Sequence, residues 1–340
     1  MSDKNNRDSV ATVSILVGLL RKKCSAFNAV KSLKNQYKNH SKSIISLLYD
    51  FSIRFLTDFL PERAIPLLLF PIFAAYCCKM DKNRPQILIT NDDGYAAKGL
   101  RKLVSLMRTL GDVTLVSTDE VMSAKSHSCT IRERIYVRLV QQEEGFTEYR
   151  CNGTPVDCVK LGYQKLMPTP PDLVVSGINH GMNAASTVVY SGTIGAVIEA
   201  CMNGLNAIGY SLYSLDPDAD FDHLDTAILE ITKKVLKEGL PKGVCLNVNF
   251  PKRCEEPMKG IKVCRQAACR WVEYFKEQYD ENGQQFYDLE GTFESDDLTE
   301  GTDLWALQHN YASVVPTCFD WTAHSQIEPM KEFEQISIKP

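Results

Sequence analysis

The chain has 340 residues, of which 44% are hydrophobic, and this length is sufficient for one large core or for two domains. Its formal net charge of -4 at pH 7 argues against a protein that binds nucleic acid polymers or membrane surfaces through an excess of basic residues. Small phosphorylated molecules are not excluded, because a local positive site can bind a phosphate whatever the net charge.

Residues 1–80 differ in composition from the rest of the chain. The first half is polar and basic, whereas residues 44–78 are mostly apolar and end in the run Ala64–Cys78, which contains Pro66 and Pro71. This run is shorter than the ~20 residues that a membrane-spanning helix requires, and it lies too far from the N-terminus for a secretory signal. We interpret residues 1–80 as an N-terminal extension outside the main fold, either upstream of a native start at Met80 or as a poorly ordered accessory segment. A membrane or targeting signal is the alternative.

The elements after Asn83 begin with a strand, a helix and a second strand. Gln86–Thr90 is a short apolar run, which predicts a buried strand. Leu100–Leu110 carries apolar residues at spacings of three and four, which is typical of an amphipathic helix. Gly111 ends this helix, and Val113–Val116 predicts the next strand. This order predicts two parallel strands joined by a helix.

The alternation of strands and helices continues to about residue 250. Further strands are predicted over Asp172–Ser176, Ala207–Leu212 and Val244–Phe250, and helices over Thr193–Asn203 and Leu224–Val235. The expected fold class is therefore α/β, with a Rossmann-like, mostly parallel sheet flanked by helices.

The pattern changes from about Gly260 onward. Three segments read as strands separated by turns such as Glu281-Asn-Gly: Gly260–Gln266, Gln285–Glu290 and Tyr311–Pro316. We interpret all three as C-terminal β-hairpin extensions of the α/β body.

Asn91-Asp92-Asp93-Gly94 directly follows the first predicted strand. Adjacent carboxylates repel each other and commonly need a cation or a shared proton, and oxygen-rich sites suit hard divalent ions. An Asx-rich turn that caps the following helix explains the motif equally well. Because ligands bind beyond the carboxyl ends of parallel strands, we expect the loops after Thr90, Ser117 and Ser176 to share one crevice.

Polar side chains also occupy the loops after the later strands. Ser123 and His127 lie four residues apart after the second strand, where an ordinary polar surface loop is the simpler interpretation. Asp157, in Gly153-Thr-Pro-Val-Asp, is expected to cap a helix. Asn179 offers a neutral oxygen to a cation, although a turn-forming Asn is an equal alternative, and the neighbouring His180 is not assigned as a ligand.

Ser191-Gly192-Thr193 stands at the start of a predicted helix. The N-terminus of a helix bares N–H groups and the positive end of the helix dipole, which together favour a phosphate. A plain Ser/Thr cap is the alternative. No Gly-Lys-Ser/Thr follows, so this is not a Walker loop.

Taken together, these segments resemble the SurE family of survival-protein 5'-nucleotidases. The matching stretches are ILITNDDGYAAKGL, STDEVMSAKSHSCT, GTPVDCVKLGY, PDLVVSGINHGMN and VVYSGTIGAVIEA, followed by CLNVNFP, VCRQAACRWVEYF and YASVVPTCFDWTAH. The resemblance covers about residues 84–325 and leaves residues 326–340 as a C-terminal tail. Two stretches depart from the family pattern, Ser117-Thr-Asp and Ala184-Ala-Ser-Thr-Val, which puts loop shape and substrate preference in doubt.

The resemblance implies a metal-dependent phosphomonoesterase that hydrolyses nucleoside 5'-monophosphates, and in some cases 3'-monophosphates and short polyphosphate. It implies one divalent ion, Mg²⁺ or Mn²⁺, whose ligands correspond to Asp92, Asp93, Ser123 and Asn179. Asp92 and Asp93 are then the catalytic residues. The phosphate of the substrate is expected at Ser191, Gly192, Thr193 and Asn179. The resemblance also implies swapped C-terminal arms and thus a homodimer or homotetramer.

Two other functions are compatible with parts of the pattern. A haloacid-dehalogenase-type phosphatase also has an Asp after its first strand, but it needs Asp-x-Asp, whereas Asp92 and Asp93 are adjacent. A catalytically silent nucleotide sensor would keep the same binding loops.

The twelve cysteines are scattered and form no Cys-x-x-Cys pair, and Cys264 and Cys269 have neither the spacing nor a nearby His for a zinc knuckle. Unpaired thiols in a reducing compartment are the favoured interpretation, and one or more disulfides are the alternative. We therefore expect a cytoplasmic protein.

Overall fold

The computed structural model describes residues 84–216 and 218–338. All the described residues belong to one compact unit, which begins at Arg84. The interpretations of residues 1–80 therefore lie outside the described residues.

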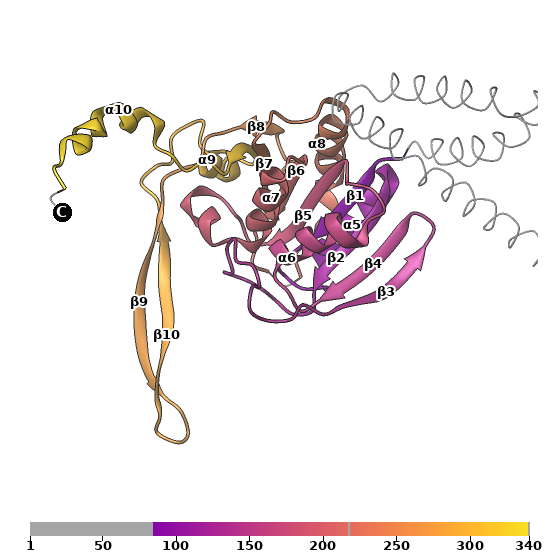
Figure 1. Cartoon of the computed structure of the whole chain (residues 1–340), viewed down its shortest axis with the longest axis horizontal. Coiled ribbons are helices and arrows are strands. Elements are labelled where there is room, and N and C mark those ends of the chain that lie inside the picture. Colours follow the sequence, from indigo (N-terminus) through magenta and orange to yellow (C-terminus); the bar gives the residue numbers. More distant parts are fainter. Residues whose placement is uncertain (1–83, 217, 339–340) are drawn as a thin grey trace, which may run out of the picture. The chain divides into compact units, whose positions relative to one another are not determined.

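A single large sheet forms the centre of this unit, with the strand order β3-β4-β2-β1-β5-β6-β7-β11-β8 (Figure 1). The strands from β4 to β7 are parallel to their neighbours, whereas β3 and β11 run antiparallel to β4 and β7. Their bounds are β1 Gln86–Thr90, β2 Asp112–Thr118, β3 Val137–Glu143, β4 Phe146–Cys151, β5 Leu173–His180, β6 Ala207–Leu212, β7 Val244–Phe250, β8 Ile261–Val263 and β11 Ala312–Cys318. The predicted mostly parallel α/β fold is confirmed.

Helices cover both faces of this sheet. Their bounds are α5 Lys98–Leu110, α6 Pro155–Leu161, α7 Gly192–Met202, α8 Asp225–Glu238, α9 Asp303–Gln308 and α10 Ile327–Met330, with shorter helical turns η1 Gly162–Leu166, η2 Ala185–Tyr190, η3 Asp222–Leu224, η4 His324–Gln326 and η5 Lys331–Gln335. No helix among residues 84–216 and 218–338 is long and apolar enough to cross a membrane.

Two hydrophobic cores follow from the alternation of side chains along β1. Ile87 and Ile89 point to the face covered by α5 and α8, where they pack with Leu100 and Ile228. Leu88, between them, packs on the other face with residues of α6 and α7. The three central residues of β1 are therefore all apolar, because a central parallel strand is buried on both sides.

The C-terminal strands differ in part from the prediction. Gln285–Glu290 does belong to a hairpin, formed by β9 (Arg270–Tyr279) and β10 (Gln285–Glu294), which projects from the sheet (Figure 1). The hairpin interpretation is wrong for the other two segments, since β8 and β11 are strands of the main sheet. Their contacts with each other and with β7 join residues that are distant in the sequence, and local patterns do not reveal such pairing.

The edge pair β3–β4 was not predicted. Six of the seven residues of β3 are exposed, so this strand lacks the apolar alternation that marks a half-buried strand. It is recognised only by its pairing with β4, which in turn lies parallel to β2.

At the other end of the unit, α10 and η5 lie in the predicted C-terminal tail and contain no buried residue.

The cysteines of the described residues are all free thiols: Cys129, Cys151, Cys158, Cys201, Cys245, Cys254, Cys264, Cys269 and Cys318. Five of them are buried. This agrees, for the part of the chain that the structure describes, with the interpretation of the cysteines as unpaired.

Candidate metal and phosphate site

Three segments meet at the carboxyl end of the sheet: the loop after β1, the end of β5 and the start of α7. Asp92 is 4% exposed and lies against the first residues of α7. Its Oδ2 accepts a hydrogen bond from Thr193 N at 3.0 Å, and its Oδ1 accepts one from Thr193 Oγ1 at 2.5 Å. The carboxylate therefore occupies a helix N-terminus, where N–H groups and the helix dipole favour negative charge.

Gly192 allows this approach. A Cβ at residue 192 would lie 2.9 Å from both Cβ and Oδ2 of Asp92, closer than real Cβ atoms come to such atoms. Ser191, one residue earlier, caps the helix, because its hydroxyl oxygen accepts a hydrogen bond from Ile194 N at 3.1 Å. The Ser-Gly-Thr sequence thus combines a cap, a close approach and two hydrogen-bond donors to Asp92.

Asp93 and Asn179 add further oxygens. His180 N donates to Asp93 Oδ2 at 2.9 Å, which ties the loop after β1 to the end of β5. The Asn179 amide nitrogen donates to Gly181 O at 2.8 Å, and this bond orients the amide so that Oδ1 lies 3.3 Å from Thr193 Oγ1. The hydroxyl of Thr193 therefore stands between Asp92 and Asn179, and the expected convergence of the β1 and β5 loops is confirmed.

Burial raises the pKa of the Asp92 carboxyl above its ordinary value, against hydrogen bonds from Thr193 that lower it. Burial, and then the neighbouring charge of Asp92, raise the pKa of Asp93 to about 6. Two ionised carboxylates side by side in a partly dry site repel each other, and a cation between them would remove that cost. Together with the Asn179 amide oxygen, this donor set fits a hard divalent ion.

The loop that carries Ser123 is fastened on both sides of that residue. Met122 N donates to Asp92 O at 2.7 Å, and Ser126 N donates to Tyr190 O at 3.0 Å. These anchors bring the Ser123 backbone beside the other predicted ligands. Its side chain is exposed and forms no hydrogen bond within the described residues.

His127 and Asp157 hold the same loop farther from the carboxylates. His127 Nε2 lies 3.2 Å from Oε2 of the buried Glu199, nearly two turns along α7 from Gly192. Asp157 forms a capping box with Thr154 at the start of α6, which confirms its predicted structural role, and it also accepts hydrogen bonds from Thr130. His127 therefore contacts α7 away from the helix start that holds Asp92, so that its geometry favours a role in positioning the loop.

Sequence reasoning missed the buried residues that support the β5 loop. Asn249 Oδ1 accepts a hydrogen bond from Asn183 N at 2.7 Å, and Asn247 donates to Asn183 O at 2.7 Å. Asp303, which is fully buried, accepts a hydrogen bond from Ala185 N at 2.7 Å. Two Asn at alternate positions of the apolar strand Val244–Phe250 were the available signal, because a buried polar side chain requires a partner.

Among residues 84–216 and 218–338, no group of three or more His, Cys, Asp or Glu side chains is arranged to hold a metal ion. The candidate site combines two carboxylates with an amide oxygen, and a serine hydroxyl is the fourth predicted ligand. Its chemistry is therefore that of a hard-ion site with few charged ligands. Such sites leave coordination positions for substrate oxygens and water.

Comparison with known proteins gives consistent matches. Residues 87–273 match the family described as Survival protein SurE. A relative from Flavobacterium psychrophilum named 5'-nucleotidase SurE is 46% identical over 253 residues, which span 74% of this chain and 98% of the relative. A protein of the same name from Christiangramia forsetii is 46% identical over 256 residues, or 75% of this chain and 98% of the relative. The crystal structure of the SurE protein from Aquifex aeolicus has a TM-score of 0.64 and 36% identity, covering 74% of this chain and all of that one.

Proposed function

This chain belongs to the SurE family of survival proteins, and on that basis we propose that it is a 5'-nucleotidase that hydrolyses nucleoside 5'-monophosphates to nucleoside and phosphate. We extend the proposal to 3'-monophosphates and short polyphosphate as secondary substrates. The residues proposed to carry the reaction are Asp92, Asp93, Ser123, Asn179 and the Ser191–Thr193 segment.

One observation carries the proposal: the Asp92 carboxylate sits on the N-terminus of α7, beside a second carboxylate and an amide oxygen. A carboxylate held at that helix end stays ionised more easily than burial alone would permit. The same region therefore offers negative oxygens to a cation, and the hydroxyl hydrogen of Ser191 to a phosphate. This combination is what a metal-assisted phosphoryl transfer needs.

We propose that one Mg²⁺ or Mn²⁺ ion would be held by Asp92, Asp93, Asn179 and the hydroxyl of Ser123. When bound, such an ion polarises a phosphoryl oxygen and lowers the pKa of a coordinated water. Asn179 suits this role because its amide nitrogen is committed to Gly181 O, which turns Oδ1 toward Thr193 and Asp92. Ser123 suits it because its loop is anchored to Asp92 O and Tyr190 O.

The protein residues would then accept the proton of the attacking water and donate hydrogen bonds to the negatively charged phosphoryl oxygens. Asp93 accepts one hydrogen bond, at Oδ2, within the described residues, and so keeps Oδ1 for the proton of an attacking water. Both oxygens of Asp92 are engaged by Thr193, which makes Asp92 the less available base. The Ser191 hydroxyl accepts from Ile194 N and still has its own hydrogen to donate to a phosphoryl oxygen.

The test is steady-state hydrolysis of AMP and GMP with Mg²⁺ or Mn²⁺, before and after EDTA. We expect EDTA to abolish phosphate release and either ion to restore it. Asp92→Asn is expected to lower kcat by about 100-fold or more, because it removes charge from both the cation and the helix end.

Asp119→Asn is the matched control, since Asp119 begins the neighbouring loop after β2 but pairs with Arg138. It should keep the wild-type rate. An Asp92→Asn enzyme that retains most of its activity would disprove the assignment of the site. Tight AMP binding without phosphate release in the wild type would instead indicate a nucleotide sensor.

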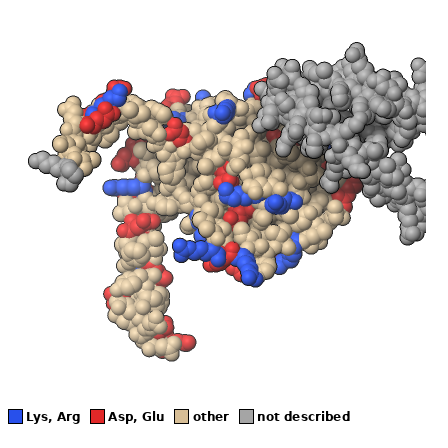
Figure 2. Space-filling view, viewed as in Figure 1, with Lys and Arg blue, Asp and Glu red and all other residues tan. Residues whose placement is uncertain are grey.

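We further propose a homodimer or homotetramer formed through the β9–β10 hairpin. Beyond Trp271, toward the tip of the hairpin, the strand pairing puts Phe275, Tyr287 and Leu289 on one face, and all three are exposed. The hairpin surface in Figure 2 is correspondingly mostly uncharged. A protruding apolar face of this kind usually has a partner that covers it.

We also propose a cytoplasmic location, because the free thiols of the described residues suit a reducing compartment. Residues 84–325 are proposed to form the complete catalytic unit. About 74% of this chain spans 98% of a curated relative, and the family match begins at residue 87, which supports this division.

A further inference from the structure

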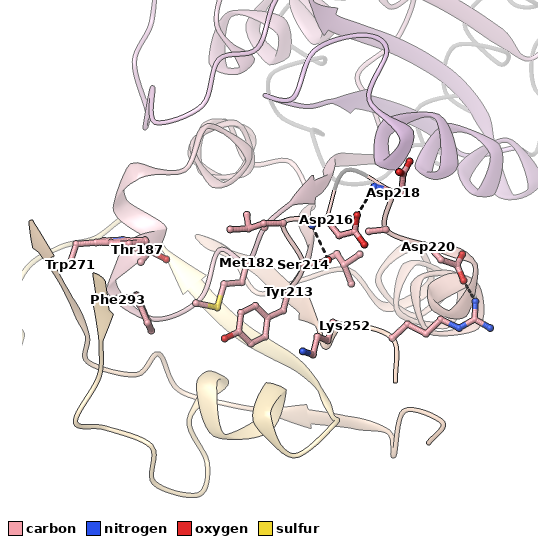
Figure 3. Close-up of a pocket in the computed structure, with 15 residues that line it drawn as sticks. Met182, Thr187, Tyr213, Ser214, Asp216, Asp218, Asp220, Lys252, Trp271 and Phe293 are labelled. Carbon is pink, nitrogen blue, oxygen red and sulfur yellow. Dashed lines mark hydrogen bonds and ion pairs between the residues drawn. The ribbon is translucent and has the colours of Figure 1, made fainter. Parts of the chain in front are cut away.

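A pocket of about 810 Å³ is lined by residues that follow β5 and β6 and by the base of the hairpin (Figure 3). One end is lined by Trp271 and Phe293 of the hairpin, and the opposite end by the carboxylates Asp216, Asp218 and Asp220. Met182 and Tyr213 lie between them (Figure 3). This volume is within the range of small-molecule sites and exceeds what a phosphate alone requires.

The pocket and the candidate site share one segment of chain. Gly181 and Met182, which line the pocket, directly follow Asn179 and His180. Thr187, on another part of the lining, lies in η2, which leads into Ser191. His180 provides a further link, since its ring nitrogen Nε2 contacts Asp216 O. A phosphoester bound at the candidate metal and phosphate site can therefore extend its organic part into this pocket.

The hairpin end of the pocket is an anchored aromatic wall. Trp271 and Phe293 are cross-strand partners whose rings meet edge to face, with centroids 5.8 Å apart. Phe293 packs against a buried cluster that includes Ala185 and Leu304, which fixes the base of the hairpin on the body. Trp271 remains 43% exposed, so one side of its indole is available to a ligand. Flat aromatic ligands stack well on such a surface.

The opposite end can accept hydrogen bonds from hydroxyl groups. Asp218 is paired with Lys98 and Asp220 with Arg253, so these two carboxylates are partly neutralised. Asp216 accepts a hydrogen bond at Oδ1 from Asp218 N, and Oδ2 accepts none from the described residues. A carboxylate oxygen of this kind can accept hydrogen bonds from a vicinal diol, while it repels a second phosphate.

We propose that this pocket is the nucleoside subsite of the enzyme, with the nucleobase against Trp271, Met182 and Tyr213 and the ribose hydroxyls facing Asp216. The proposal rests on the nucleotidase function proposed above and deepens it, because it makes the base a determinant of substrate choice. A nucleoside 5'-monophosphate is then preferred to a sugar phosphate that lacks the base.

Equilibrium binding of adenosine tests the subsite without requiring catalysis. Isothermal titration of the full-length protein in EDTA should detect adenosine but not ribose. Trp271→Ala should weaken adenosine binding by about tenfold, because a base stacked on an aromatic side chain loses that contact. Trp271→Phe should recover most of the affinity, and Tyr213→Ala, on a different element, should also weaken binding.

Phe275→Ala is the matched control, since Phe275 is an exposed aromatic residue of the same hairpin that does not line the pocket. It should bind adenosine like the wild type. Adenosine binding that is absent in the wild type, or unchanged in both Trp271→Ala and Tyr213→Ala, would overturn the subsite.

Kinetics separate the two proposals. The kcat/KM for AMP should exceed that for ribose 5-phosphate in the wild type, and Trp271→Ala should remove this preference through the KM for AMP, with ribose 5-phosphate unaffected. Equal use of both substrates by the wild type would refute the subsite and leave the phosphomonoesterase intact. Adenosine binding with neither ester hydrolysed would refute the nucleotidase and leave the subsite intact.

Discussion

At the scale of single residues, Asp92 is held at the start of α7 and is also a proposed ligand of the cation. Its hydrogen bonds from Thr193 N and Thr193 Oγ1 fix the carboxylate on the helix end. Such an interaction of a carboxylate with a helix N-terminus contributes about 0.3–2 kcal/mol, and it opposes the rise in pKa that burial causes. The helix thus offsets part of the cost of charging a buried acid, although burial still raises the pKa of Asp92.

Gly192→Ala tests this arrangement at a single residue. The added Cβ would lie 2.9 Å from Oδ2 and Cβ of Asp92, so the carboxylate must move away from Thr193 N. We expect a fall in kcat and in Mn²⁺ affinity with little loss of thermal stability, since Ala is otherwise favourable in a helix. Enzyme kinetics, metal titration and thermal unfolding measure the three effects.

Gly204→Ala provides the comparison. Gly204 has φ of 77° and nothing within 4 Å of an added Cβ, so the substitution strains the backbone without touching the site. It should cost about 1–2 kcal/mol of stability and leave activity unchanged. If Gly192→Ala keeps full activity, the close approach of Asp92 to α7 is not needed for function.

At the scale of the elements, the candidate site depends on the positions of the ends of β1 and β5 and of the loop after β2. The carboxyl ends of β1 and β5 are neighbours in register, with Thr90 opposite Ser176, so the residues that follow them necessarily meet. The loop after β2 joins them because it is tied to Asp92 O, to Tyr190 O and to Glu199 on α7. The site is therefore an assembly of strand ends on a rigid sheet, which suits a metal-assisted reaction.

The β9–β10 hairpin gives a prediction for an element. Phe275 and Tyr287 pack edge to face at 6.4 Å on its apolar face and are nevertheless exposed. Replacing both with Asp should convert the proposed oligomer to a monomer, because two charges cannot be buried in an apolar contact without a large cost. Size-exclusion chromatography with light scattering measures the mass.

Gln278→Asp with Thr292→Asp is the charge-matched control, since alternation along the strands puts these residues on the opposite face. This variant should keep the wild-type mass. A wild-type protein that is already monomeric would reject the hairpin as an oligomerisation element.

At the scale of the whole molecule, the described unit is expected to work without the preceding segment. Both hydrophobic cores and all the candidate site residues lie between residues 84 and 338. Deletion of residues 1–79 should therefore leave a folded protein with the kcat and KM of the full chain for AMP. Circular dichroism and steady-state kinetics are the measurements. Insoluble or inactive truncated protein would mean that the first segment contributes to the fold or the site.

The sequence by itself determined the parallel α/β body and the candidate ligands. Apolar runs such as Gln86–Thr90 and the periodicity of Leu100–Leu110 are local signals, because burial on both faces or on one face leaves its own spacing of apolar residues. The Asn91-Asp92-Asp93-Gly94 motif was visible for a similar reason, since its two carboxylates are consecutive in the sequence. The resemblance of five segments in order then linked them to one family.

Only the tertiary structure decided what depends on contacts between distant residues. It put Asp92 on Thr193 N, joined β11 to β7, and revealed that Asn249 and Asp303 support the loops beside the site. It also brought Trp271 of the hairpin to the same pocket as Asp216. None of these partners is close in sequence, and a side chain carries no local mark of the distant group that will satisfy its hydrogen bonds or cover its surface.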